Sequence, residues 1–179
     1  MSADSKDWVA KFKRRTLRNV QEAFADHLAD LMAGCEALCE SPIEVAMLYA
    51  LRGSLVSSDG FYGLPVEFHP LRFQRWPEAP APFKALWVLP QCQIGLYRAD
   101  FGILIDEREK QRWLAVECDG HDFHERTKEQ ARRDRSRDRW MMLNGVQVVR
   151  FTGQEIFQDP GKCAESIHET IYHMMMGDI

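Results

Sequence analysis

Residues 113–119 read WLAVECD, an apolar run that ends in two acids. The run is typical of a buried strand, in which side chains two positions apart point to the same side. Glu117 and Asp119 would therefore leave the strand on one face, at the carboxyl end where sheet enzymes commonly keep their chemistry. Acids among such apolar neighbours need a partner, which makes this strand end a candidate site.

A second strand with an acid precedes the first. Residues 91–105 read QCQIGLYRADFGILI and contain Asp100, and only the charged segment 106–112 separates them from Trp113. A turn that short favours an antiparallel hairpin. With the turn centred near residue 109, the cross-strand partner of Asp100 falls close to residue 118, and a small adjustment of the register brings Asp100 beside Glu117 or Asp119.

Three carboxylates at one place repel one another. At ~4 Å each ionised pair costs roughly 1–4 kcal/mol at effective dielectric constants of 80 to 20. A divalent cation relieves this repulsion, and ligands that are all oxygen favour Mg²⁺ or Mn²⁺. The alternative is that the three acids are ordinary solvated residues at strand ends.

The elements that follow predict a strand-helix-strand crossover. A helix over 125–144 ends at Asn144-Gly145, and the apolar strand 146–151 follows directly. A crossover of this kind makes the strands 113–119 and 146–151 parallel within a mixed sheet covered by helices. A last helix begins with Asp159 as its N-cap and Pro160 in its first turn.

Two helices are predicted before the sheet. The apolar spacing over 7–38 predicts the first, and a capping box that starts at Ser41 and ends at Glu44 predicts the second, which runs to Gly53. Residues 53–90 are rich in Gly and Pro and predict an irregular insertion with short strands near 64–69 and 84–89.

We expect one domain over residues 1–179, with an N-terminal helical segment at 1–40 and a core at 41–179. The composition, 45% hydrophobic and 28% charged, is that of a soluble globular protein. No apolar run is long enough to cross a bilayer, and residues 1–20 lack the apolar region of a secretory signal. The sequence therefore predicts a cytoplasmic protein that does not enter a membrane.

Charge and cysteine usage narrow the function classes. The net charge of −4 excludes a uniformly basic nucleic-acid binder, but basic residues gather at 11–18 and 126–139. Such local positive segments suit an enzyme that touches a polyanion and releases it, and they also suit solvated helix faces. The five cysteines form no CxxC pair, which favours free thiols over a zinc finger.

Four short segments carry a resemblance to a known family. They read QCQIGLYRADF at 91–101, VECDGH at 116–121, RDR at 133–135 and VVRF at 148–151. Their order and spacing resemble the PD-(D/E)XK nuclease superfamily, and more narrowly its small domains related to very short patch repair endonucleases. The resemblance implies an α/β fold, a restriction-endonuclease-like mixed β-sheet core flanked by helices, here with an N-terminal helical extension. It also implies a Mg²⁺- or Mn²⁺-dependent endonuclease, with DNA as the expected substrate.

The resemblance assigns roles to the acids. Asp100 and Glu117 become metal ligands, with Glu44 as a third ligand from the helix, where many members carry an additional acid. Asp119 stands where the superfamily usually has a lysine. Lys128, on the following helix, could supply that positive charge, or Asp119 could act as a further ligand or as a base. A third alternative is that catalysis is lost and only binding to nucleic acid or protein remains.

Basic side chains near the acids are candidate nucleic-acid contacts. One helix face collects Lys128, Arg132, Arg135 and Arg139, and Arg98 lies close to Asp100 in the sequence. The same residues also suit a salt-bridged solvent face.

The histidines and the oligomeric state leave alternatives open. His124 is a candidate for phosphate contact or proton transfer. A zinc site formed by His121 and His124 is the alternative, but it lacks a second pair of ligands. A homodimer is a further alternative, because many nucleases that cut both strands dimerise.

Overall fold

The computed structural model describes residues 16, 18, 29–30, 32–56, 60–70, 84–107, 110–120 and 128–177, with no side chains for 128–131. The chain divides into two compact units, Met1–Gly34 and Cys35–Ile179, and the elements below belong to the second. The helix predicted over 7–38 falls largely outside the described residues, although 32–36 are helical.

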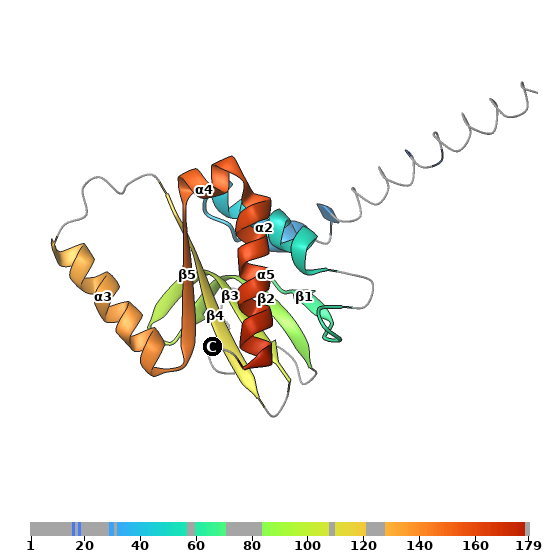
Figure 1. The fold of residues 1–179 in the computed structure, drawn as a ribbon. Coiled ribbons are helices and arrows are strands. Elements are labelled where there is room, and N and C mark those ends of the chain that lie inside the picture. Colours follow the sequence, from blue (N-terminus) through green and yellow to red (C-terminus); the bar gives the residue numbers. More distant parts are fainter. Residues whose placement is uncertain are drawn as a thin grey trace, which may run out of the picture. The chain divides into compact units, whose positions relative to one another are not determined.

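A mixed sheet of five strands forms the centre of this second unit (Figure 1). Its order follows the chain: β1 (Val66–Phe68), β2 (Ala85–Ile94), β3 (Tyr97–Asp106), β4 (Gln111–Asp119) and β5 (Val146–Thr152). Strands β2, β3 and β4 pair antiparallel, whereas β1 with β2 and β4 with β5 pair parallel. The predicted hairpin and the predicted parallel crossover are both confirmed.

Within the described part of this unit, the helices that flank the sheet are α2 (Pro42–Leu55), α3 (Lys128–Leu143), α4 (Gly153–Gln158) and α5 (Pro160–Met176). Helices α2, α4 and α5 pack against one another, and α3 packs against β5 (Figure 1). Met141 of α3 is fully buried in a cluster with Trp87 and Trp113 of the sheet. The predicted α/β class, a mixed sheet flanked by helices, is confirmed.

The predicted helix starts are present. The Ser41 hydroxyl accepts the N–H of Glu44 at 3.4 Å at the start of α2, and the Asp159 carboxylate accepts the N–H of Lys162 at 2.9 Å at the start of α5. Gly145 has a φ of 69° directly after α3, a left-handed conformation that glycine adopts without strain.

Two predicted boundaries are wrong. Residues 91–105 are not one strand, because a turn at Gly95-Leu96 divides them. Gln91–Ile94 form the end of β2, and the residues after the turn belong to β3. Gly95 has a φ of 60°, and a Cβ at this position would lie only 2.0 Å from the Trp140 ring. The insertion predicted over 53–90 therefore ends in a long core strand, in which every residue from Ala85 to Cys92 is buried.

Helix α4 was not predicted, because its six residues are too few to show helical periodicity. A capping box between Thr152 and Glu155 starts it. None of the helices that the structure describes combines the length and the apolar character that crossing a membrane requires.

Candidate active site

The sheet opens at Asp100. On one side, the ladder between β3 and β4 stops at the pair Phe101 and Val116. Beyond this pair the Asp100 carboxylate, through Oδ2, accepts the backbone N–H of Cys118 at 2.7 Å. The Asp100 side chain thus replaces a backbone partner where β3 and β4 separate, next in the chain to Glu117.

On the other side of β3, the pairing with β2 is interrupted at a single step. The β2–β3 register pairs Pro90 with Phe101 and Cys92 with Ala99 but passes over Gln91 and Asp100, which stand opposite each other. Gln91 has a φ of 51°, a left-handed conformation that costs a residue with a side chain about 1–2 kcal/mol. Local strain of this kind gathers at functional sites.

The Glu44 carboxylate is buried and receives three hydrogen bonds. Its Oε1 accepts from the Ser41 hydroxyl at 2.7 Å, and its Oε2 accepts from the Glu40 backbone N–H and from the Gln91 side-chain amide, both at 2.8 Å. The N-terminus of α2 also favours a negative charge here. Glu44 therefore ties the start of α2 to the strained position in β2.

The Gln91 side chain is 3% exposed, and its Oε1 has no hydrogen-bond partner among the described residues. Leaving a buried acceptor unpaired costs about 1–3 kcal/mol. Sequence reasoning missed this residue, because its importance lies in a contact with Glu44, 47 positions earlier.

Asp100 is in an unfavourable environment for a negative charge. Burial raises the pKa of its carboxyl group, and the nearby Glu44 raises it further, whereas the Cys118 N–H and Arg137 lower it. The net shift is upward. The structure thus brings Glu44 and Asp100 close enough to repel each other, whereas the mutual repulsion predicted among Asp100, Glu117 and Asp119 stays a prediction.

Glu117 is 6% exposed, and it forms an ion pair with Arg137 of α3. The pKa of Arg137 is lowered by burial first and by the charge of Arg150 second, while Asp100 raises it. Its buried Nε makes no hydrogen bond within the described part of the chain. Arg137 is therefore a positive group between two of the predicted acidic residues, and sequence reasoning missed it among the many arginines of α3.

Asp119 ends β4 opposite Thr152 and is partly buried. Its charge raises the pKa of Arg150, for which the larger cause is the hydrogen bond to Asp138. Lys128 begins α3, but its side chain lies outside the described residues, as do His121 and His124 entirely.

Two thiols lie near the acids. Burial raises the pKa of Cys39 to about 12, and Glu44 and Asp100 contribute to the rise. The pKa of Cys118 is raised for the same reasons. A nucleophilic cysteine needs a lowered pKa, and burial, followed by these acids, shifts the pKa of both thiols in the opposite direction.

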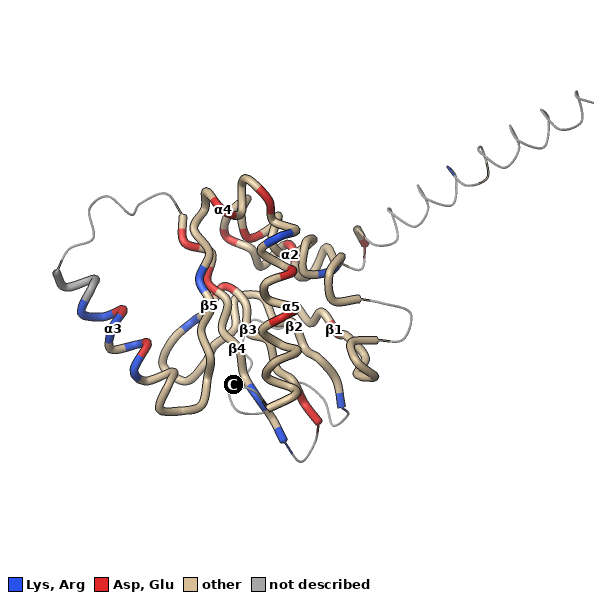
Figure 2. The backbone as a smooth tube through the Cα atoms, viewed as in Figure 1, with Lys and Arg blue, Asp and Glu red and all other residues tan. Residues whose placement is uncertain are grey.

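The predicted basic face of α3 points outward. Arg132, Arg135 and Arg139 are exposed, and Figure 2 shows basic and acidic residues alternating along this helix. Arg98 is exposed as well, and its guanidinium forms two hydrogen bonds of 2.8 Å with Glu40. Contacts of these arginines with nucleic acid stay a prediction.

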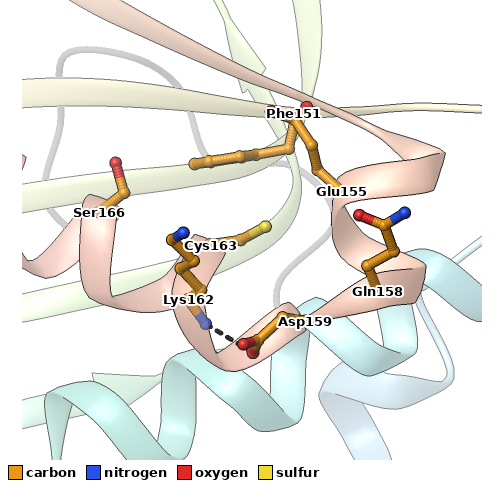
Figure 3. A pocket seen from close by; sticks show the side chains of 7 residues that line it. All are labelled: Phe151, Glu155, Gln158, Asp159, Lys162, Cys163 and Ser166. Carbon is orange, nitrogen blue, oxygen red and sulfur yellow. Dashed lines mark hydrogen bonds between the residues drawn. The ribbon is translucent and has the colours of Figure 1, made fainter.

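A separate pocket of about 310 Å³ lies between the end of β5, α4 and α5 (Figure 3). Its lining residues are Phe151, Glu155, Gln158, Asp159, Lys162, Cys163 and Ser166. Glu155 and Asp159 are engaged in capping α4 and α5, and burial followed by these two acids raises the pKa of Cys163. The chemistry of this pocket is thus explained by helix capping, and no predicted site residue lines it.

A metal ion would find oxygen donors at the opening of the sheet. Carboxylates of Asp100 and Glu117 and the amide of Gln91 are all oxygen ligands of the kind that Mg²⁺ and Mn²⁺ prefer. In the part of the chain that the structure describes, no three His, Cys, Asp or Glu side chains meet closely enough to hold a metal ion by themselves.

Comparison with known proteins adds a family to this geometry. Residues 84–171, just under half of the chain, match the model of the restriction endonuclease-like family REase_MTES_1575. The match runs from β2 into α5 and contains Gln91, Asp100 and Glu117. No curated protein and no solved structure matches the chain.

The family match and the mixed sheet agree with each other. They support a restriction-endonuclease-type nuclease domain with nucleic acid as its partner, whereas the narrower resemblance to very short patch repair endonucleases stays a prediction. Residues 84–171 thus form a domain similar to the restriction endonuclease-like family REase_MTES_1575.

Proposed function

We propose that the protein is a metal-dependent endonuclease of the PD-(D/E)XK type that hydrolyses phosphodiester bonds in DNA. One observation carries the proposal: Asp100 and Glu117 lie on neighbouring strands just beyond the last pair of the β3–β4 ladder, inside a domain similar to a restriction endonuclease-like family. Glu117 is buried and Asp100 is half-buried, and carboxylates so shielded from water destabilise the fold, which gives them a functional reason to be there.

Asp100 and Glu117 would hold Mg²⁺ or Mn²⁺. Bound there, the ion would lower the pKa of the attacking water and neutralise charge on the phosphate. Glu44 would support the ligands from α2. Because both of its oxygens already accept hydrogen bonds, its contribution in the metal-free protein is to hold the Gln91 amide in place.

Arg137 would supply the positive charge that a lysine provides elsewhere in the superfamily. It already pairs with Glu117, and its Nε is free to donate to a phosphate oxygen. Such a preorganised donor stabilises the charge that develops in the transition state. Lys128 is the alternative source of this charge, and Asp119 is a candidate base or further ligand.

A second function follows from the same ion pair. Arg137 neutralises Glu117 without any metal, so the domain could bind nucleic acid through its fold and have no activity. The acid at position 119, where a lysine is usual, favours this inactive binding module. The two functions differ in the effect of a divalent ion. In the nuclease the ion permits cleavage of the nucleic acid, whereas in the binding module it changes only the affinity for nucleic acid.

A cleavage assay separates the two functions. Wild type, Asp100→Ala and Glu117→Ala are incubated with single- and double-stranded DNA and RNA, with and without Mg²⁺ or Mn²⁺. Glu169→Ala, which removes an exposed acid on α5, is the matched control. The wild type and the control should cleave DNA only with the metal. Both site variants should lose about 10²–10³-fold in rate, since a bound metal supplies several kcal/mol of stabilisation.

Each other outcome has a definite meaning. Cleavage that persists in both site variants, with circular dichroism unchanged, contradicts the assigned site. Binding of DNA by the wild type without any cleavage favours the inactive module. Cleavage of RNA alone would correct the substrate and keep the mechanism.

A further inference from the structure

We propose that Gln91 is an oxygen ligand of the metal site, through its side-chain Oε1, and that Glu44 is the residue that orients it. The inference rests on the proposed function, because it names a further ligand of the same site. It starts from a polar atom that the fold buries and leaves without a partner, Oε1 of a side chain that is only 3% exposed.

The position of Gln91 places it beside the acids. It stands directly opposite Asp100 in the β2–β3 ladder. The pairs on either side of these two residues are formed, but Gln91 and Asp100 themselves are not paired through their backbones. Asp100 in turn reaches across to the N–H of Cys118 on β4. Gln91, Asp100 and the end of β4 therefore follow one another across three adjacent strands.

The contact with Glu44 determines which way the amide faces. A carboxylate only accepts hydrogen bonds, so the Gln91 group that lies 2.8 Å from Glu44 Oε2 must be the NH₂ group. The two ends of the amide point apart, and Oε1 is thus turned away from Glu44. The Ser41 hydroxyl and the Glu40 N–H hold Glu44 in turn, so the orientation of the amide is set by the start of α2.

The arrangement is costly unless Oε1 has a use. A buried unpaired oxygen destabilises the fold, and so does the left-handed backbone of Gln91. A carboxamide oxygen is a good ligand for hard cations and adds no negative charge. It completes a set of three oxygens with Asp100 and Glu117 without adding to the repulsion that already raises the pKa of Asp100.

The test measures Mn²⁺ binding directly, by the loss of the free-ion electron paramagnetic resonance signal, in full-length protein without nucleic acid. Gln91→Asn is the main variant, because asparagine tolerates a left-handed φ and keeps the amide but withdraws the oxygen by one methylene. Gln91→Ala removes the oxygen altogether. Gln93→Ala is the matched control, because Gln93 lies two residues further along β2 and its amide donates to the Gly95 carbonyl instead.

We expect both Gln91 variants to bind Mn²⁺ at least about tenfold more weakly than the wild type, and Gln93→Ala to bind like the wild type. Thermal unfolding with EDTA shows whether each variant is folded. Wild-type affinity in folded Gln91→Asn overturns the ligand role and leaves the proposed function standing. Absence of Mn²⁺ binding in the wild type overturns both, and an equal loss in Gln93→Ala overturns the role of Gln91 specifically.

Discussion

Asp100 shows how one side chain can favour function at the expense of stability. Its carboxylate is close to Glu44 and half-buried, and the single N–H of Cys118 offsets only part of the cost. Carboxylate ligands must be ionised to bind a cation, so in the metal-free protein the ionised carboxylates of such a site repel one another. Replacing such groups commonly stabilises a protein while removing its activity.

Asp100→Asn should therefore stabilise the metal-free protein at neutral pH. The pKa of Asp100 is raised above its ordinary value of 3.8, so folding disfavours the charged form. The cost is fully present above the raised folded pKa and disappears below the unfolded pKa, where both states are protonated. In EDTA, the Tm of Asp100→Asn should exceed that of the wild type at about pH 8, and the gap should close toward about pH 4.

The control for this measurement is Glu169→Gln, which neutralises an exposed acid on α5. Its Tm should follow that of the wild type at each pH. A gap between Asp100→Asn and wild type that grows as the pH falls would show that the Asp100 charge stabilises the fold, against this account.

At the residue scale, the sequence was sufficient to predict that Asp100 and Glu117 lie on neighbouring strands, because both belong to one short hairpin, and their role as metal ligands stays a prediction. It was insufficient for Gln91 and Arg137. The role of Gln91 depends on a left-handed backbone and on an orphaned atom, and neither has a signature in residue type. Arg137 is chemically identical to its neighbours on α3, and only the direction in which the helix turns it distinguishes it.

Helix α3 places its arginines in two environments, one facing the sheet and one facing solvent. Arg137 points toward the sheet with its side chain 19% exposed, whereas Arg135 is exposed. Trp140 and Met141, one turn further on, pack against the core cluster and fix which side faces inward. One element thus brings a positive charge to Glu117 and turns other positive charges toward solvent.

The Arg137→Ala variant should bind Mn²⁺ more tightly than the wild type and should cleave nucleic acid more slowly. Arg137 and the metal compete for Glu117, so removing the arginine should raise the Mn²⁺ affinity about tenfold, or ~1.4 kcal/mol. The cleavage rate should fall about 10²-fold, as expected when one preorganised donor to the transition state is lost. Mn²⁺ titration and a cleavage assay measure the two effects, with Arg135→Ala as the exposed control. Equal values in the two variants would rule out a role for Arg137 at the site.

At the element scale, local signals sufficed for helix starts and for the crossover to β5, because capping residues and turn glycines act within a few positions. The limits of β2 and β3 needed information from further away. The turn at Gly95 lies against Trp140 of α3, a residue 45 positions later in the chain. Helix α4 depends on a capping box at Thr152 rather than on any apolar periodicity.

At the scale of the whole molecule, the net charge of −4 opposes binding to a polyanion. Basic residues can therefore promote binding only where they are concentrated on one part of the surface. Figure 2 shows Lys and Arg interleaved with acids along α3, and the ion pair of Arg137 with Glu117 brings one of these positive charges to the candidate site. Phosphate contacts release counterions, which makes the salt dependence of binding a measure of how many such contacts form.

The triple variant Arg132→Ala, Arg135→Ala and Arg139→Ala should reduce the salt dependence of DNA binding. Each phosphate contact contributes about 0.9 to the slope of log Kobs against log salt concentration, so the slope should become shallower by roughly 2–3. Fluorescence anisotropy with duplex DNA in EDTA measures it without cleavage. The control replaces the exposed Lys84, Lys110 and Lys162 by Ala, which changes the net charge equally and leaves α3 intact. If the two triple variants have the same slope, net charge governs binding and the α3 face has no specific part in it.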